Sequence, residues 1–98
     1  MPMMSKSATI TERLSPVHPG VVLKEEFMEP LGLSANSLGA KIGVPPNRIS
    51  EIIRGRRSIT ADTALRLADH LGTTAEFWMN LQVHHDLEVA RDRRAEVA

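Results

Sequence analysis

The sequence predicts an all-α fold of five helices, and three observations lead to this prediction. Apolar residues recur at helical spacing in several segments, and no segment shows the sustained period-two alternation that marks a half-buried strand. Glycines, prolines and capping residues divide the chain at short intervals, as expected for helices joined by tight turns. The length of 98 residues suits one compact domain.

The composition restricts the class of protein. Apolar residues make up 42% of the chain and aromatic residues only 3%, so the core must be mainly aliphatic. The absence of cysteine excludes disulfides, thiolate metal sites and cysteine nucleophiles. No apolar run approaches the roughly 18–20 residues of a membrane span, and the N-terminus lacks the apolar stretch of a signal peptide. We therefore expect a cytoplasmic protein without a membrane partner.

The first helix follows an irregular N-terminal segment. Residues 1–17 show no helical period and are expected to form a flexible arm. His18-Pro19-Gly20 opens the helix, because a proline in the first turn has no N–H to leave unpaired. Pro30 is expected to stop it. The apolar residues at helical spacing that should face the core are Val22, Leu23, Phe27 and Met28.

The second and third helices are short and sharply bounded. Ser34 is a good N-cap for a second helix of about nine residues that ends at Gly43. Pro45-Pro46 forces a turn and precedes a third helix, expected from Asn47 to Arg54 and ending at Gly55.

The fourth and fifth helices complete the domain. Thr60 caps the fourth, which ends before Gly72 and carries an apolar stripe of Ala61, Ala64, Leu65, Leu67, Ala68 and Leu71. Thr73 and Glu76 fit a capping box at the start of the fifth helix, with Phe77, Trp78 and Leu81 along one side. This helix is expected to fray from Asp86 onward, so we place the domain at 18–92 and a frayed tail at 93–98.

The segment from Ser34 to Arg54 meets the geometric requirements of a helix-turn-helix. A small residue, Gly39, lies where the two helices must cross, and Gly43 can adopt the positive φ that the turn requires. The apolar residues that would lock the pair together are Leu38, Ile42, Val44, Ile49, Ile52 and Ile53. An ordinary αα-hairpin is the alternative, but it explains neither this register nor the polar outer face.

The outer face of the third helix carries side chains that can recognise base edges. These residues are Asn47, Arg48, Ser50, Glu51 and Arg54. Arginine pairs with guanine, asparagine with adenine and glutamate with cytosine. Asn47 and Arg48 are the first candidates, because the N-terminus of such a helix enters the major groove most deeply. Two interpretations of Glu51 remain open: it contacts a base, or it pairs with Arg48 or Arg54 and orients that side chain.

The charge distribution supports a nucleic-acid surface although the net charge is zero. From Lys41 to Arg57 five basic residues face one acid, giving 5 − 1 = +4. Such a patch suffices for electrostatic docking on DNA, but solvated surface charge is the alternative. Free N–H groups at the start of the second helix also favour an anion, even if Ser34 serves as a cap alone. The candidate phosphate-binding residues are Ser34, Asn36, Ser37, Lys41, Arg56 and Arg57.

Five motifs carry a resemblance to a known family. They are HPG at 18–20, EPLGLS at 29–34, PPNRISEIIRGRR at 45–57, ITADTALRLA at 59–68 and EFWMNLQ at 76–82. Residues 18–87 resemble the HigA-type antitoxins, a branch of the Xre-type, phage-repressor-like DNA-binding proteins. The sequence departs from the pattern at Gly39, where alanine is commoner, and residues 1–17 lie outside it.

The resemblance implies a five-helix lambda-repressor-like fold and a homodimer that binds operator DNA in its own promoter. It also implies neutralisation of a partner toxin, a HigB-type ribonuclease that cleaves mRNA. The fifth helix resembles the dimer element, with Trp78 and Leu81 as candidate contacts, whereas Phe77 is expected in the core; all three could instead close the core against the first helix. Two recognition helices in such a dimer would bind half-sites roughly 34 Å apart.

Several alternatives remain after this comparison. The acidic face of the first helix (Glu25, Glu26 and Glu29) could meet a basic nuclease or be merely solvated, and a stand-alone regulator would have no toxin. An interaction module that had lost DNA binding would carry a neutral or apolar outer face, unlike this one. We expect no enzymatic activity, cofactor, metal or small-molecule substrate, because adjacent His84 and His85 point in different directions on a helix and no catalytic arrangement appears.

Overall fold

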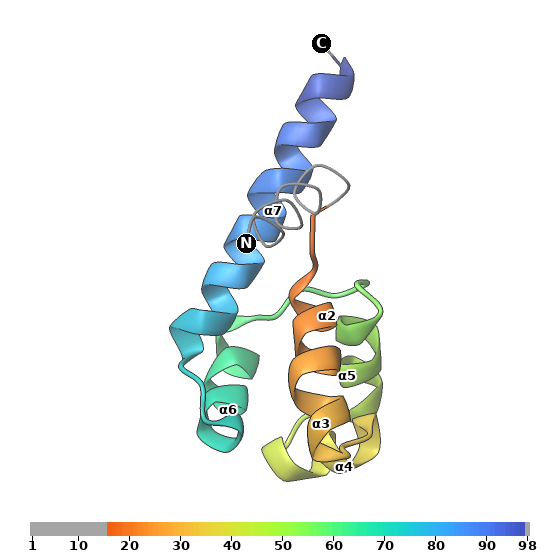
Figure 1. Ribbon diagram of the computed structural model, residues 1–98, viewed down its shortest axis with the longest axis vertical. Helices are drawn as coiled ribbons and strands as arrows, with labels where there is room; N and C mark the ends of the chain where they lie inside the picture. Colours follow the sequence, from red (N-terminus) through yellow and green to blue (C-terminus); the bar gives the residue numbers. More distant parts are fainter. Residues whose placement is uncertain (1–15, 98) are drawn as a thin grey trace, which may run out of the picture.

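The computed structural model describes residues 16–97, which form five helices and no strand (Figure 1). The all-α prediction is therefore confirmed for this part of the chain. The expected arm falls largely on residues 1–15, outside the described residues.

The first helix is continuous from Pro19 to Leu31, in three segments: α2 (Pro19–Val22), the π-helical turn η1 (Leu23–Met28) and α3 (Glu29–Leu31). The prediction that Pro30 stops this helix is wrong. The backbone is already wound more widely before the proline, with the Glu29 N–H donating to the Lys24 carbonyl. A π-helical turn shifts the hydrogen-bond register, so the missing N–H of Pro30 does not interrupt the helix. The helix ends instead at Gly32, whose φ is 67°.

The next two helices have the boundaries expected from their caps. Helix α4 spans Ala35–Ile42 and ends at Gly43 with φ at 76°, which a residue with a Cβ rarely adopts. Helix α5 spans Pro46–Ile53 and follows Pro45 directly. The two helices pack against each other, and α5 also lies beside α2 (Figure 1).

Helix α6 spans Ala61–Leu71, and its N-cap is Thr60, whose side chain accepts a hydrogen bond from the Thr63 N–H. Its predicted apolar stripe is only partly correct. Ala64 and Leu67 are fully buried, whereas Leu65 is 58% exposed, and Ala61 is also exposed. The buried face is therefore narrower than the run of aliphatic residues suggested.

Helix α7 spans Ala75–Val97, 23 residues, and its far end projects beyond the other helices (Figure 1). The predicted fraying from Asp86 and the tail at 93–98 do not match this helix, which is continuous to Val97. The predicted capping box is also wrong. Thr74, not Thr73, accepts a hydrogen bond from the N–H of Phe77, at 3.0 Å, and Thr73 accepts one from the Trp78 indole, at 2.7 Å.

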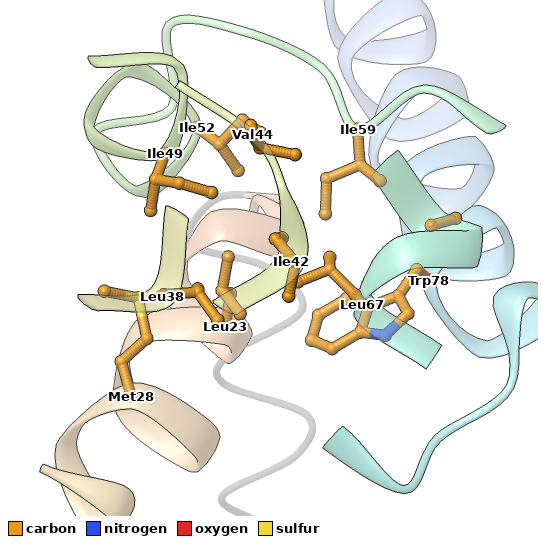
Figure 2. Packing of buried hydrophobic residues seen from close by; sticks show 11 residues of the cluster. Leu23, Met28, Leu38, Ile42, Val44, Ile49, Ile52, Ile59, Leu67 and Trp78 are labelled. Carbon is orange, nitrogen blue, oxygen red and sulfur yellow. The ribbon is translucent and has the colours of Figure 1, made fainter. Parts of the chain in front are cut away.

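The core draws on all five helices and on two loops. Figure 2 shows its side chains converging from η1, α4, α5, α6 and α7. The buried apolar residues are Leu23, Met28, Leu38, Ile42, Val44, Ile49, Ile52, Ile59, Ala64, Leu67 and Trp78. Aliphatic side chains therefore dominate, as the composition predicted, and Trp78 is the one aromatic residue that is fully buried among the described residues.

Candidate nucleic-acid interface

Gly39 allows the turn between α4 and α5 to lie against the backbone of α4. A Cβ at this position would lie 2.5 Å from the Val44 carbonyl oxygen, closer than ordinary contact. The Gly39 carbonyl accepts hydrogen bonds from the N–H groups of Gly43 and Val44, at 2.8 and 3.0 Å. The predicted role of Gly39 as the small residue at the crossing is confirmed, and the close approach fixes the angle between the helices.

Isoleucines set which face of α5 points outward. Ile49 and Ile52 are fully buried, and Ile53 packs against the same core. Because a helix repeats every 3.6 residues, the polar residues between them must turn away from the core. Asn47 and Arg54 are exposed, and Arg48, Ser50 and Glu51 are half-buried at the edge of this face.

Two arginines on this face have no acidic partner among residues 16–97. Within residues 16–97 neither Arg48 nor Arg54 takes part in an ion pair. Of the two interpretations of Glu51, the pairing with Arg48 or Arg54 is therefore not observed. Glu51 pairs instead with Arg57, whose Nε lies 2.9 Å from the Glu51 Oε1. Arg48 and Arg54 thus keep all of their guanidinium donors available.

The N-terminus of α4 is closed by a reciprocal serine cap. The Ser37 N–H donates to the Ser34 hydroxyl at 3.0 Å, and the Ser34 N–H donates to the Ser37 hydroxyl at 2.8 Å. Both hydroxyls therefore act as acceptors in the cap, and each carries one O–H donor besides. The first N–H groups of a helix have no intrahelical acceptor, so the amides of Ala35 and Asn36 are further donors for an anion at this end.

The remaining predicted phosphate-binding residues are exposed. Lys41 lies in the last turn of α4, and Arg56 and Arg57 follow α5 in the loop that begins at Gly55. These residues therefore lie at the ends of two helices, α4 and α5, that pack against each other.

Arg66 of α6 binds the C-terminal end of α4, a contact that the sequence did not predict. Its Nη1 donates to the carbonyl of Ile42 at 3.1 Å and lies 3.5 Å from that of Gly43. These carbonyls end α4 and lack intrahelical partners. The spacing of Asp62 and Arg66, whose side chains pair at 2.9 Å, indicated only a surface pair on α6.

This geometry matches a known family. The helix-turn-helix family model HTH_3 matches residues 24–78, which include α4, α5 and the turn between them. The chain belongs to the helix-turn-helix family. Within residues 16–97 this helix-turn-helix protein has no group of three acidic, histidine or cysteine residues that could hold a metal ion, and none of those helices is long and apolar enough to cross a membrane.

The relatives of this chain include a HigA antitoxin, a member of the branch that the five motifs resemble. Virulence-associated protein I of Dichelobacter nodosus is 46% identical over 81 residues, 83% of this chain and 75% of that protein. Antitoxin HigA-1 of Vibrio cholerae is 43% identical over 83 residues, 85% of this chain and 78% of that protein.

Solved structures agree with the sequence relatives. Antitoxin GraA superposes with a TM-score of 0.81 at 42% identity, covering 85% of this chain and 89% of that one. The Pseudomonas aeruginosa antitoxin HigA, solved with the higBA promoter, gives a TM-score of 0.79 at 36% identity, covering 83% and 88%. The HigA-type, Xre-like resemblance and the five-helix fold class are therefore confirmed.

The burial of the aromatic pair on α7 differs from the prediction. Trp78, expected at a dimer contact, is fully buried in its own chain and packs beside Phe27, with 5.3 Å between ring centroids. Phe77, expected in the core, is 37% exposed. A fully buried side chain has no surface to offer a second copy, so the dimer assignment of Trp78 is wrong, while Leu81, half-buried, remains a candidate.

Gln82 is a further structural residue that the sequence did not single out. It is 4% exposed, and its Oε1 accepts a hydrogen bond from the Ile59 N–H at 2.8 Å. Its Nε2 donates to the Asp86 carboxylate at 2.9 Å. Gln82 thus ties the loop that follows α5 to helix α7. The only sequence feature that included Gln82 was the EFWMNLQ motif at 76–82.

Proposed function

We propose that this protein binds operator DNA in its own promoter through α5 and thereby represses its own operon. One observation carries the proposal: buried Ile49 and Ile52 turn a polar, arginine-bearing face of α5 outward. The HigA relative solved with the higBA promoter supports DNA as the ligand of this face.

The proposed contacts divide into two kinds. Asn47, Arg48, Ser50 and Arg54 contact base edges, and Glu51 is the fifth candidate at the same surface. Asn47 and Arg48 lie in the first turn of α5, the part expected deepest in the major groove. The proposed phosphate contacts are made by Ser34, Asn36, Ser37, Lys41, Arg56 and Arg57. At the N-terminus of α4 the free amides of Ala35 and Asn36 can donate, and a serine hydroxyl that accepts in the cap keeps its own proton to donate to a phosphate.

We further propose that the protein acts as a homodimer. Helix α7 has an apolar outer side that its own chain leaves exposed, with Val83 at 52% and Leu87 at 47%. Leu81 is half-buried on the same helix. A second copy related by a two-fold axis would bring two α5 helices to half-sites about one helical turn, roughly 34 Å, apart.

The second part of the proposal is neutralisation of a HigB-type ribonuclease toxin. It is supported by the similarity to a named HigA antitoxin. Glu25, Glu26 and Glu29 are all exposed on the first helix and offer an acidic surface to a basic nuclease. The alternative is a regulator without a toxin. Co-expression with the product of the adjacent reading frame separates the two, since only an antitoxin forms a stable complex that blocks mRNA cleavage.

A pair of arginine variants tests the DNA-binding proposal. Arg48→Ala removes a base contact, so selective binding to the operator should fall at least tenfold, about 1.4 kcal/mol or more, within the range for one bidentate base contact. Arg57→Ala removes a phosphate contact, so all DNA should bind more weakly and the salt slope should drop by about one. Gel-shift titrations with operator and scrambled duplexes measure both effects.

Arg93→Ala provides the matched control. Arg93 is an exposed arginine on α7, away from the side that carries Val83 and Leu87, so its loss lowers the net charge equally without altering α5. If Arg48→Ala and Arg57→Ala both bind like the parent and like this control, the assigned surface is wrong.

A further inference from the structure

Glu51 organises the loop that follows α5 through both its backbone and its side chain. Its carbonyl accepts a hydrogen bond from the Arg56 N–H at 2.8 Å, across the left-handed turn at Gly55, where φ is 76°. Its carboxylate accepts one from the Arg57 Nε at 2.9 Å. Two consecutive arginines are thereby tied to one residue of the recognition helix.

The ion pair uses only part of the arginine. A guanidinium has five N–H donors, and the contact to Glu51 occupies Nε. The terminal nitrogens of Arg57 remain available, and its side chain is 50% exposed. An arginine held through Nε is fixed in direction and still able to form a two-pronged hydrogen bond with a phosphate.

The same contact makes Glu51 a poor base reader. Its side chain is 42% exposed and already pairs with a cation. Arg57 engages only Oε1 of this carboxylate. The second oxygen belongs to a side chain whose direction the ion pair sets and whose negative charge the DNA phosphates repel, and both effects disfavour a contact with a cytosine amino group. Exposed ion pairs add little to folding stability, so the contact matters chiefly for where the Arg57 side chain points.

We infer that Glu51 is a positioning residue that holds Arg57 toward the DNA backbone and does not itself select a base. This inference rests on the proposed DNA-binding function. According to this inference, Glu51 of α5 raises the affinity for DNA through Arg57. The other polar residues of α5 select the base sequence.

A double-mutant cycle tests the inference. Operator affinity is measured by fluorescence anisotropy for the wild type, Glu51→Ala, Arg57→Ala and the double variant, and base preference is measured on duplexes with every single base-pair change. Glu51→Ala should weaken operator binding three- to tenfold while base preference stays the same at every position. In the Arg57→Ala background the further loss should be below 1.5-fold, because the residue that Glu51 positions is gone.

Glu29→Ala is the matched control, since it removes one exposed acid that lies 3.9 Å from Lys24 on the first helix. Loss of discrimination at one base pair in Glu51→Ala would overturn the inference, as would an undiminished effect in the Arg57→Ala background or an effect equal to that of Glu29→Ala. If the wild type does not distinguish operator from scrambled DNA in the same assay, the proposed function itself fails, and the inference with it. Thermal unfolding followed by circular dichroism confirms that each variant is folded.

Discussion

At the scale of single residues, His18 connects three parts of the fold. Its Nδ1 accepts a hydrogen bond from the Gly20 N–H at 2.9 Å and so caps α2. Its ring meets that of His85 on α7, with centroids 4.8 Å apart, and a Cβ on Gly55, after α5, would lie 3.8 Å from it. The cap requires an unprotonated Nδ1. Partial burial lowers the pKa of His18, and nearby His85 lowers it further, while Asp86 acts in the opposite direction.

The lowered pKa of His18 predicts a pH dependence of stability. The unfolded chain takes up a proton near the ordinary value of 6.5, before the folded protein does. The free energy of unfolding should therefore fall as pH drops below 6.5 and level off beneath the folded pKa, with no contribution above about pH 7.5. Urea unfolding at several values between about pH 7.5 and 5 measures this trend.

Substitution by asparagine isolates the effect of His18. His18→Asn keeps a good N-cap acceptor but has no titrating group, so its stability should vary less with pH over this range. His84→Asn, at an exposed position on α7, controls for the loss of an imidazole. An unchanged pH profile in His18→Asn would show that the cap is not the source of the dependence.

Residue identity predicted the outward face of α5 more reliably than it predicted the packing of the aromatic residues. Ile49 and Ile52 had to be buried on a short amphipathic helix, which settled the direction of Asn47 and Arg54 from spacing alone. Phe77 and Trp78 are adjacent, so spacing cannot decide which of them turns inward. That depends on the tertiary contact of Trp78 with Phe27 and on the local conformation that brings the Thr73 hydroxyl to 2.7 Å from the indole nitrogen.

At the scale of secondary-structure elements, α2 and α5 pack with their backbones in near contact. Gly20 is buried, and a Cβ on it would overlap the Ile52 carbonyl group of α5. Helix α5 is therefore supported directly by the first helix, at a point where no side chain intervenes.

Gly20→Ala tests this support. The added methyl group must separate α2 from α5, and overpacking of this kind costs about 1–3 kcal/mol, more than the gain of up to about 1 kcal/mol from the helix propensity of alanine. We expect the free energy of unfolding to fall by about 1–2 kcal/mol and operator affinity to fall with it. Urea denaturation followed by the fluorescence of buried Trp78 measures the change, and a variant as stable as the parent would contradict the packing.

Element boundaries were predictable where one residue decides them. Ser34, Gly43 and Thr60 start or end helices by their own chemistry, and α4 and α6 accordingly begin and end where expected. Pro30 and the length of α7 were missed for a different reason. The π-helical turn before the proline depends on backbone register, and the helical end of α7 has no apolar stripe from which its extent could be predicted.

At the scale of the whole molecule, the zero net charge conceals two surfaces of opposite sign. The basic residues follow α4 and α5 into the Gly55 loop, whereas Glu25, Glu26 and Glu29 lie exposed on the first helix. DNA and a basic protein would therefore meet different elements of the same small fold. The proposed operator contacts and the proposed toxin contacts would then not compete for one surface.

The central claim is that α5, anchored by isoleucines, presents Asn47 and Arg48 to a duplex groove. Titration of ¹⁵N-labelled protein with a duplex from upstream of its own gene tests it most directly. The account predicts that amide shift changes concentrate on residues 47–54 and 34–37, together with the Arg48 side-chain Nε–H, while residues 90–96 barely move. Unchanged resonances across 47–54, or the largest changes on the acidic first helix, would contradict it.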